Sequence, residues 1–171
     1  MATTSSPPLS DSEAGDYSHE HRPLAAYGAL TSGLTAAFVA GAVAAARNRG
    51  GLPERYRFED LLTAGIATHK ISRALAKEKV TSFIRAPFVR YREPAGFGEL
   101  DEQPRGTGLQ LAVGELLVCP YCLGHWIASA FGVGLVGAPR ATRLVAFIFT
   151  AETIADFLQL AYKHTVDQVG K

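Results

Sequence analysis

The two cysteines of this 171-residue chain are three positions apart, at Cys119 and Cys122. A pair at this spacing can form and break a disulfide bond. Pro120 is favourable at the first position of a helix, which would leave Cys119 at the helix N-terminus, where the helix dipole stabilises a thiolate. The segment therefore predicts a candidate redox pair, in which Cys119 attacks and Cys122 resolves.

The sequence Cys119-Pro120-Tyr121-Cys122 matches the active-site tetrapeptide of glutaredoxins. That fold surrounds its cysteines with strand–helix–strand units, and we predict no strand before or after the tetrapeptide. The redox interpretation therefore depends on four residues alone. Whether the protein is an enzyme stays open, and we favour a non-enzymatic one.

A metal-binding interpretation uses Cys119, Cys122 and His125, because two thiolates and an imidazole suit zinc. A closed tetrahedral site needs a fourth ligand. The candidates are His69, His164 and Asp156, or a second copy of the chain. Zinc is the cofactor that this interpretation implies.

The third interpretation, which we favour, is structural. The two cysteines would be reduced thiols at the tight start of a helix, and Trp126 would anchor that helix at a membrane interface. His125 would then be an interfacial side chain whose ring nitrogens have hydrogen-bond partners.

The elements around these residues begin with two contrasting segments. Residues 1–23 are rich in Ser, Thr, Pro and acids, and we predict a disordered acidic tail. Residues 24–46 carry no charge and are long enough for a transmembrane helix. Gly33, Ala37 and Gly41 recur every four residues, a pattern that lets another helix approach closely in lipid. A homo-oligomer through these residues is therefore possible.

The remaining chain, 58–162, is predicted to form a helical membrane domain. A helix over 58–77 has an apolar side, and it either lies in the membrane interface or crosses with its charges facing other helices. Residues 80–110 read as a polar internal loop. A short helix over 109–118, capped by Thr107, leads to a helical hairpin of 124–137 and 144–162. Residues 163–171 form a short polar tail.

Three charged residues in these helices are predicted to form structural polar pairs. Glu152 and Asp156 lie one turn apart on the last helix, and an acid in lipid is costly unless it meets protein, water or a cation. Arg73, with His69 and Lys70, offers basic partners on the 58–77 helix. We favour an interhelical ion pair over a proton or cation relay.

Charge counting favours one topology. If the 58–77 helix lies in the interface and the N-terminus is outside, 14 of the basic residues lie inside and 3 outside, as the positive-inside rule requires. Four crossings with the N-terminus inside give a weaker bias of 9 against 6. Both arrangements put the cysteine segment in the cytoplasm.

Composition narrows the possible partners. Basic and acidic residues nearly balance, 17 against 16, and no basic stripe is interleaved with aromatics, so nucleic acid is not an expected partner. The expected partner is the lipid bilayer. We predict an all-α integral membrane protein with three or four transmembrane or interfacial helices and a polar internal loop.

The chain from Asp60 to Tyr162 resembles a bacterial family designated domain of unknown function 1360. The matching landmarks are Lys79-Val80-Thr81, Arg85-Ala86-Pro87-Phe88, Glu93-Pro94, Arg105-Gly106-Thr107-Gly108, Gly114-Glu115-Leu116-Leu117, Cys119 to Gly124, Asp156 and Leu158-Gln159. We predict that the protein lies in the bacterial inner membrane and crosses it several times. The resemblance implies a small helical integral membrane protein of unassigned activity. It supplies no catalytic residues.

Overall fold

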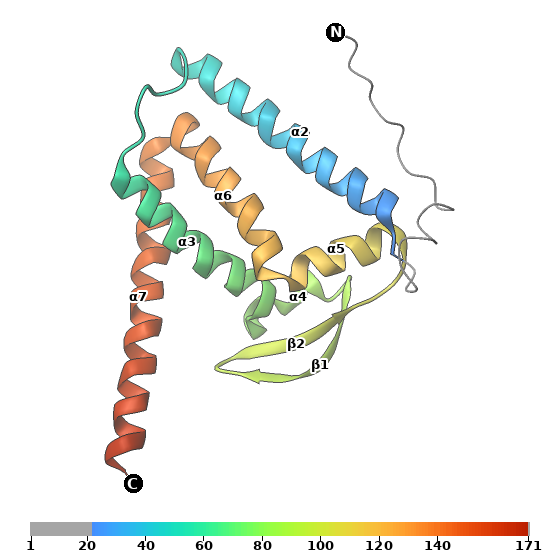
Figure 1. Ribbon diagram of the computed structural model, residues 1–171, viewed down its shortest axis with the longest axis vertical. Coiled ribbons are helices and arrows are strands. Elements are labelled where there is room, and N and C mark those ends of the chain that lie inside the picture. The colour runs from blue at the N-terminus through green and yellow to red at the C-terminus, as the bar shows by residue number, and fades with distance from the viewer. Residues whose placement is uncertain (1–21, 171) are drawn as a thin grey trace. The chain divides into compact units, whose positions relative to one another are not determined.

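A computed structural model describes residues 22–170, so the predicted acidic tail lies almost entirely outside the described residues. The described chain is mostly helical and contains one β-hairpin (Figure 1). The elements are α2 (Leu24–Arg49), α3 (Phe58–Lys77), the 3-10 turn η1 (Lys79–Thr81), α4 (Ser82–Arg85), β1 (Val89–Gly96), β2 (Glu99–Pro104), α5 (Gly108–Val118), α6 (Pro120–Gly137) and α7 (Pro139–Val169).

The chain forms two compact units. The first contains the chain up to Ala37 together with Ala76–Cys119, and the second contains Phe38–Leu75 together with the chain from Pro120 onward. The hairpin belongs to the first unit, and most of the long helical segments belong to the second.

The hairpin corrects the prediction of an all-α chain without a strand before the cysteine segment. Residues 80–110 were expected to be a loop, but β1 and β2 pair antiparallel there, with Phe97 at positive φ in the turn between Gly96 and Gly98. The strands lack the alternation of apolar and polar residues that marks a half-buried strand, because all of β1 after Val89 is exposed. Pro94 is tolerated because it lies at a register irregularity of an edge strand.

Arg85 holds the hairpin to the chain that precedes it. The side chain of Arg85 is fully buried. Its Nε donates to the Glu102 carboxylate of β2, and Nη1 donates to Thr81 Oγ1 over 2.8 Å. Nη2 donates to the carbonyl oxygen of Glu78 over 3.0 Å. The guanidinium thus has a charged partner and two neutral acceptors, as a buried charge requires.

The second unit is built from the C-terminal half of α2 with α3, α6 and α7. Its buried core is made of one residue from each of the last three helices, Ala67, Phe131 and Ala146. Helix α2 packs on α6, where the ring of Phe38 stacks on Trp126 with centroids 5.8 Å apart. A Cβ at Gly41 would lie 3.5 Å from Val133, so Gly41 faces α6 of its own chain.

Helix boundaries agree with the sequence at α3 and differ at α7. The helix predicted over 58–77 is confirmed as Phe58–Lys77. Thr107 precedes α5 as predicted, although its side chain makes no capping hydrogen bond. Helix α7 begins at Pro139 instead of residue 144, because proline is accommodated in the first turn of a helix. It also continues through Val169, so most of the predicted polar tail is helical.

Within residues 22–170, two helices, α2 and α7, are long and apolar enough to cross a membrane. The number rises to three if α5 and α6 together count as one broken span. Helix α7 exposes most of its apolar side chains, and α2 has no buried residue.

Candidate functional site

The cysteine segment joins α5 to α6. Cys119 is the residue between the two helices, and Cys122 lies in the first turn of α6. Both cysteines are disulfide-bonded, and they are the only two in the chain. The expectation of reduced thiols is therefore corrected: a separation of three residues at a helix start is compatible with a disulfide.

The tetrapeptide is accessible from solvent. Tyr121 is 91% exposed, and Cys122 is also exposed, whereas Cys119 is partly buried. An exposed sulfur is the one that an incoming thiolate can reach. The segment can therefore undergo thiol–disulfide exchange in chemical terms, and the assignment of Cys119 and Cys122 as a redox pair stays a prediction.

The predicted zinc ligands do not form a cluster. Within residues 22–170, no group of three or more His, Cys, Asp or Glu side chains is arranged to hold a metal ion. The ring of His125 is exposed and packs edge-on against Trp126, with centroids 4.8 Å apart. Zinc binding through Cys119, Cys122 and His125 would require the disulfide to be reduced, and it stays a prediction.

Helices α3 and α7 are joined by an ion pair. Lys70 Nζ lies 2.9 Å from Asp156 Oδ2 and 3.4 Å from Glu152 Oε1. The Lys70 side chain is only 12% exposed, whereas nearly half of each carboxylate side chain is exposed. Lys70 is one of the basic residues that the sequence analysis offered as partners of these acids, and the polar pairing of Arg73 stays a prediction.

Two further contacts lie along the same pair of helices. Arg143 donates two hydrogen bonds of 2.8 Å to the carboxylate of Asp60. Thr150 Oγ1 donates over 3.0 Å to the carbonyl oxygen of Thr63. We call these two contacts and the Lys70–Asp156 pair the α3–α7 seam.

The seam defines the direction of the helices. The paired residues are separated by 83, 87 and 86 positions, from Asp60–Arg143 through Thr63–Thr150 to Lys70–Asp156. Because the partners on α7 follow the same order as those on α3, the two helices run in the same general direction, and in Figure 1 α3 crosses α7 obliquely. The α2–α3 loop and the α6–α7 turn therefore lie at the same end of the seam.

A second contact supports this placement. Both Nε and Nη2 of Arg49, at the end of α2, donate to the carbonyl oxygen of Gly137, at 3.0 and 2.7 Å. These contacts place the end of α2 beside the end of α6. Charge counting could not detect this, because it weighs each loop separately and does not say which helices pair.

Comparison with known proteins identifies a family whose model matches this chain. The model of a family described as "Protein of unknown function (DUF1360)" matches residues 62–162. The UPF0713 protein YngL of Bacillus subtilis (strain 168) is 26% identical over 109 residues, which are 63% of this chain and 82% of the relative. No solved structure gives a significant match.

The matched region begins in α3 and ends in α7. It includes the hairpin, the cysteine segment and, of the seam, Thr63, Lys70 and their partners on α7, and it leaves out α2. Because the family model covers more than half of the sequence, this chain belongs to the DUF1360 family of proteins of unknown function.

Proposed function

We propose that this protein is an integral membrane protein of the bacterial inner membrane with a non-enzymatic, structural or assembly role. Four helices cross the bilayer in this proposal: α2, α3, α6 and α7. The parallel register of the α3–α7 seam is the observation that carries it. If α7 crosses, α3 runs in the same direction beside it, and α6 returns between them.

Helix α3 is long enough to cross a bilayer, although its charged residues make it less apolar than α2 and α7. Its 20 residues correspond to about 30 Å at 1.5 Å per residue, the thickness of a bilayer core. Lys70 is mostly buried against Asp156 and Glu152, so its charge is offset by neighbouring protein. Paired, inward-facing charges of this kind are the ones that membrane helices tolerate.

Four crossings also fix an orientation. Residues 47–57 and 138–143 then share one face and carry six basic residues, and the other face carries nine. The positive-inside rule favours the nine-residue face as cytoplasmic. The N-terminus, the hairpin and the cysteine segment are therefore cytoplasmic in this proposal.

Single-cysteine labelling tests the topology. The background is the double variant Cys119→Ser/Cys122→Ser, and the reporters are Leu52→Cys, Ala141→Cys and Phe97→Cys, all at exposed positions. With a membrane-impermeant maleimide on intact cells, we expect labelling at positions 52 and 141 and none at 97. Labelling of 52 and 141 from opposite faces would overturn the four-crossing arrangement.

The assembly role depends on α2. Gly33 and Ala37 are exposed, and a Cβ at Gly33 would meet no atom within 4 Å, whereas Gly41 is already packed on Val133. We therefore propose that a second copy contacts the Gly33–Ala37 part of the stripe. Gly33→Leu should reduce chemical cross-linking of the detergent-solubilised protein to a dimer, and Gly28→Leu is the control. Equal cross-linking in both variants and the wild type would overturn this contact.

Thiol–disulfide exchange is a second candidate function, because both cysteines are disulfide-bonded and Cys122 is exposed. A thiolate of a partner dithiol would attack one sulfur, form a mixed disulfide and release the other cysteine as a thiolate. The second partner thiol would then displace the protein, which leaves Cys119 and Cys122 reduced and the partner oxidised. Disulfides in the bacterial cytoplasm are usually transient, as this cycle requires.

Thiol trapping separates this candidate from the structural role. Acid quenching of cells followed by alkylation should give a mixture of reduced and oxidised protein, and the oxidised fraction should change with an added diamide or dithiothreitol pulse. Cys119→Ser and Cys122→Ser are compared for mixed disulfides with other proteins. A pair that stays fully in one state through both pulses would exclude exchange.

A further inference from the structure

Four arginines surround a cavity of about 380 Å³ at the end of the seam where the α2–α3 loop meets the α6–α7 turn. The arginines are Arg49, Arg55, Arg57 and Arg143, and Asp60 is the one acidic residue in the lining. All the lining residues belong to one compact unit. The volume lies in the range of small-molecule sites, roughly 300–1,000 Å³.

The charges in this cavity are not balanced. Arg143 is neutralised by its two hydrogen bonds to Asp60, and Arg57 is paired with Glu59 just outside the lining. Arg49 donates only to the neutral carbonyl oxygen of Gly137, so its positive charge has no counterion there. Arg55 makes no hydrogen bond or ion pair with any residue from 22 to 170.

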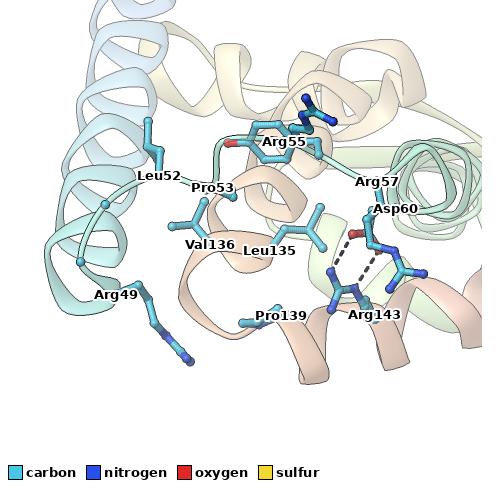
Figure 2. Close-up of a pocket in the computed structure, with 13 residues that line it drawn as sticks. Arg49, Leu52, Pro53, Arg55, Arg57, Asp60, Leu135, Val136, Pro139 and Arg143 are labelled. Carbon is cyan, nitrogen blue, oxygen red and sulfur yellow. Dashed lines mark hydrogen bonds and ion pairs between the residues drawn. The ribbon is translucent and has the colours of Figure 1, made fainter.

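Arg49 and Arg55 are therefore the two arginines of the lining without a counterion among residues 22–170. Figure 2 shows them on different sides of the apolar residues Leu135 and Val136. Arginine presents a planar set of donors that matches the oxygens of a phosphate. The apolar part of the lining continues through Leu52, Pro53 and Tyr56. The cavity therefore combines cationic edges with an apolar floor.

The loop that carries Arg55 has a defined conformation. Gly50 and Gly51 have φ values of +78° and +131°, which L-residues with a side chain rarely adopt. The Gly51 amide donates over 2.8 Å to the carbonyl oxygen of Ala46 and so ends α2. The chain turns there and brings residues 52–57 back over the ends of α6 and α7.

We propose that this cavity binds a phosphate-bearing anion through Arg55, with the apolar portion of the anion against Leu135 and Val136. The anion is either the headgroup of an anionic phospholipid or a soluble phosphate ester. The lipid source rests on the proposed membrane function, since four crossings put the cavity at headgroup depth, where an arginine can donate to the phosphate of an anionic lipid.

Binding is measured on the full chain in neutral detergent, by the shift of the thermal unfolding midpoint with two probes. One probe is phosphatidylglycerol, with phosphatidylcholine as its control, and the other is glycerol 3-phosphate. Stabilisation by phosphatidylglycerol alone identifies a lipid headgroup, and stabilisation by glycerol 3-phosphate identifies a soluble ester. No stabilisation by either probe overturns the proposal.

Variants locate the site. Arg55→Gln should weaken binding roughly tenfold, the effect of losing one charge-assisted hydrogen bond. Arg90→Gln, an exposed arginine of the hairpin, is the charge-matched control and should bind as the wild type does. Arg55 has no partner within the described chain, so its loss should leave folding intact. Equal weakening in both variants would show non-specific charge attraction and overturn the site.

This test is independent of the topology. If cysteine labelling contradicts four crossings while Arg55→Gln still weakens binding selectively, the cavity stands and the crossing arrangement does not. If labelling supports four crossings and neither probe stabilises the protein, the cavity proposal alone fails.

Discussion

Lys70 Nζ lies 2.9 Å from Asp156 Oδ2, and the two residues belong to helices separated by the hairpin and the cysteine segment. This contact, with Asp60–Arg143 nearer the helix starts, means that α3 and α7 run side by side in the same direction. In the proposed membrane arrangement, the direction of α3 decides which loops share a face, so the Lys70–Asp156 contact bears directly on the topology.

Loss of Lys70 should destabilise the second unit. Lys70→Ala leaves two carboxylates without this cation, and we expect the free energy of unfolding to fall by about 1–2 kcal/mol, less than for a fully buried pair because both acids are half-exposed. The measurement is a denaturation curve in mixed detergent micelles. Lys163→Ala removes an exposed pair with Asp167 on α7 and should cost at most about 0.5 kcal/mol.

The Asp60–Arg143 pair offers a charge-reversal test of the parallel register. Asp60→Arg and Arg143→Asp should each lower the thermal unfolding midpoint, because each puts like charges together. The double variant restores opposite charges and should recover most of the loss. Simple additivity of the two single effects would mean that the residues are not in contact.

Arg85 should be among the most sensitive positions in the first unit. Arg85→Met strands the Glu102 carboxylate, whose side chain is 5% exposed, and we expect a loss of about 3–5 kcal/mol. The double variant Arg85→Met/Glu102→Met removes both charges and should be more stable than the single variant. Limited proteolysis near Phe97 reports whether the hairpin has detached, and Arg92→Met is the exposed control on β1.

Gly114 lies where α5 passes close to the hairpin. A Cβ there would be 2.6 Å from the backbone oxygen of Phe88 and 3.2 Å from Pro104 Cβ. Gly114→Ala should therefore cost about 1–3 kcal/mol, since backbone must move. Gly132→Ala, where a Cβ meets nothing within 4 Å in α6, should be neutral or slightly stabilising. Equal thermal midpoints for the two variants would contradict the close approach.

The sequence by itself determined which segments are helical and which are apolar. Period and charge gave α3 its observed bounds, and the uncharged run predicted the apolar part of α2. Cys119 and Pro120 were recognised as the start of a helix, because proline favours the first helical position regardless of what lies around it. Family membership also followed from sequence landmarks, which residues 62–162 match.

Only the tertiary structure decided the pairings. The hairpin has no alternating pattern because most of its side chains face solvent, so its strands are set by the turn at Phe97 and by Arg85. From the sequence, Arg85 is one of several charged residues in a predicted polar loop. Its burial depends on the ion pair with Glu102, 17 residues later in the chain. Likewise the pairing of Lys70 with Asp156, and the gathering of Arg49, Arg55 and Arg143 at one cavity, depend on contacts across more than 80 residues. Local propensity has no access to such contacts, because they are fixed by how the helices pack together.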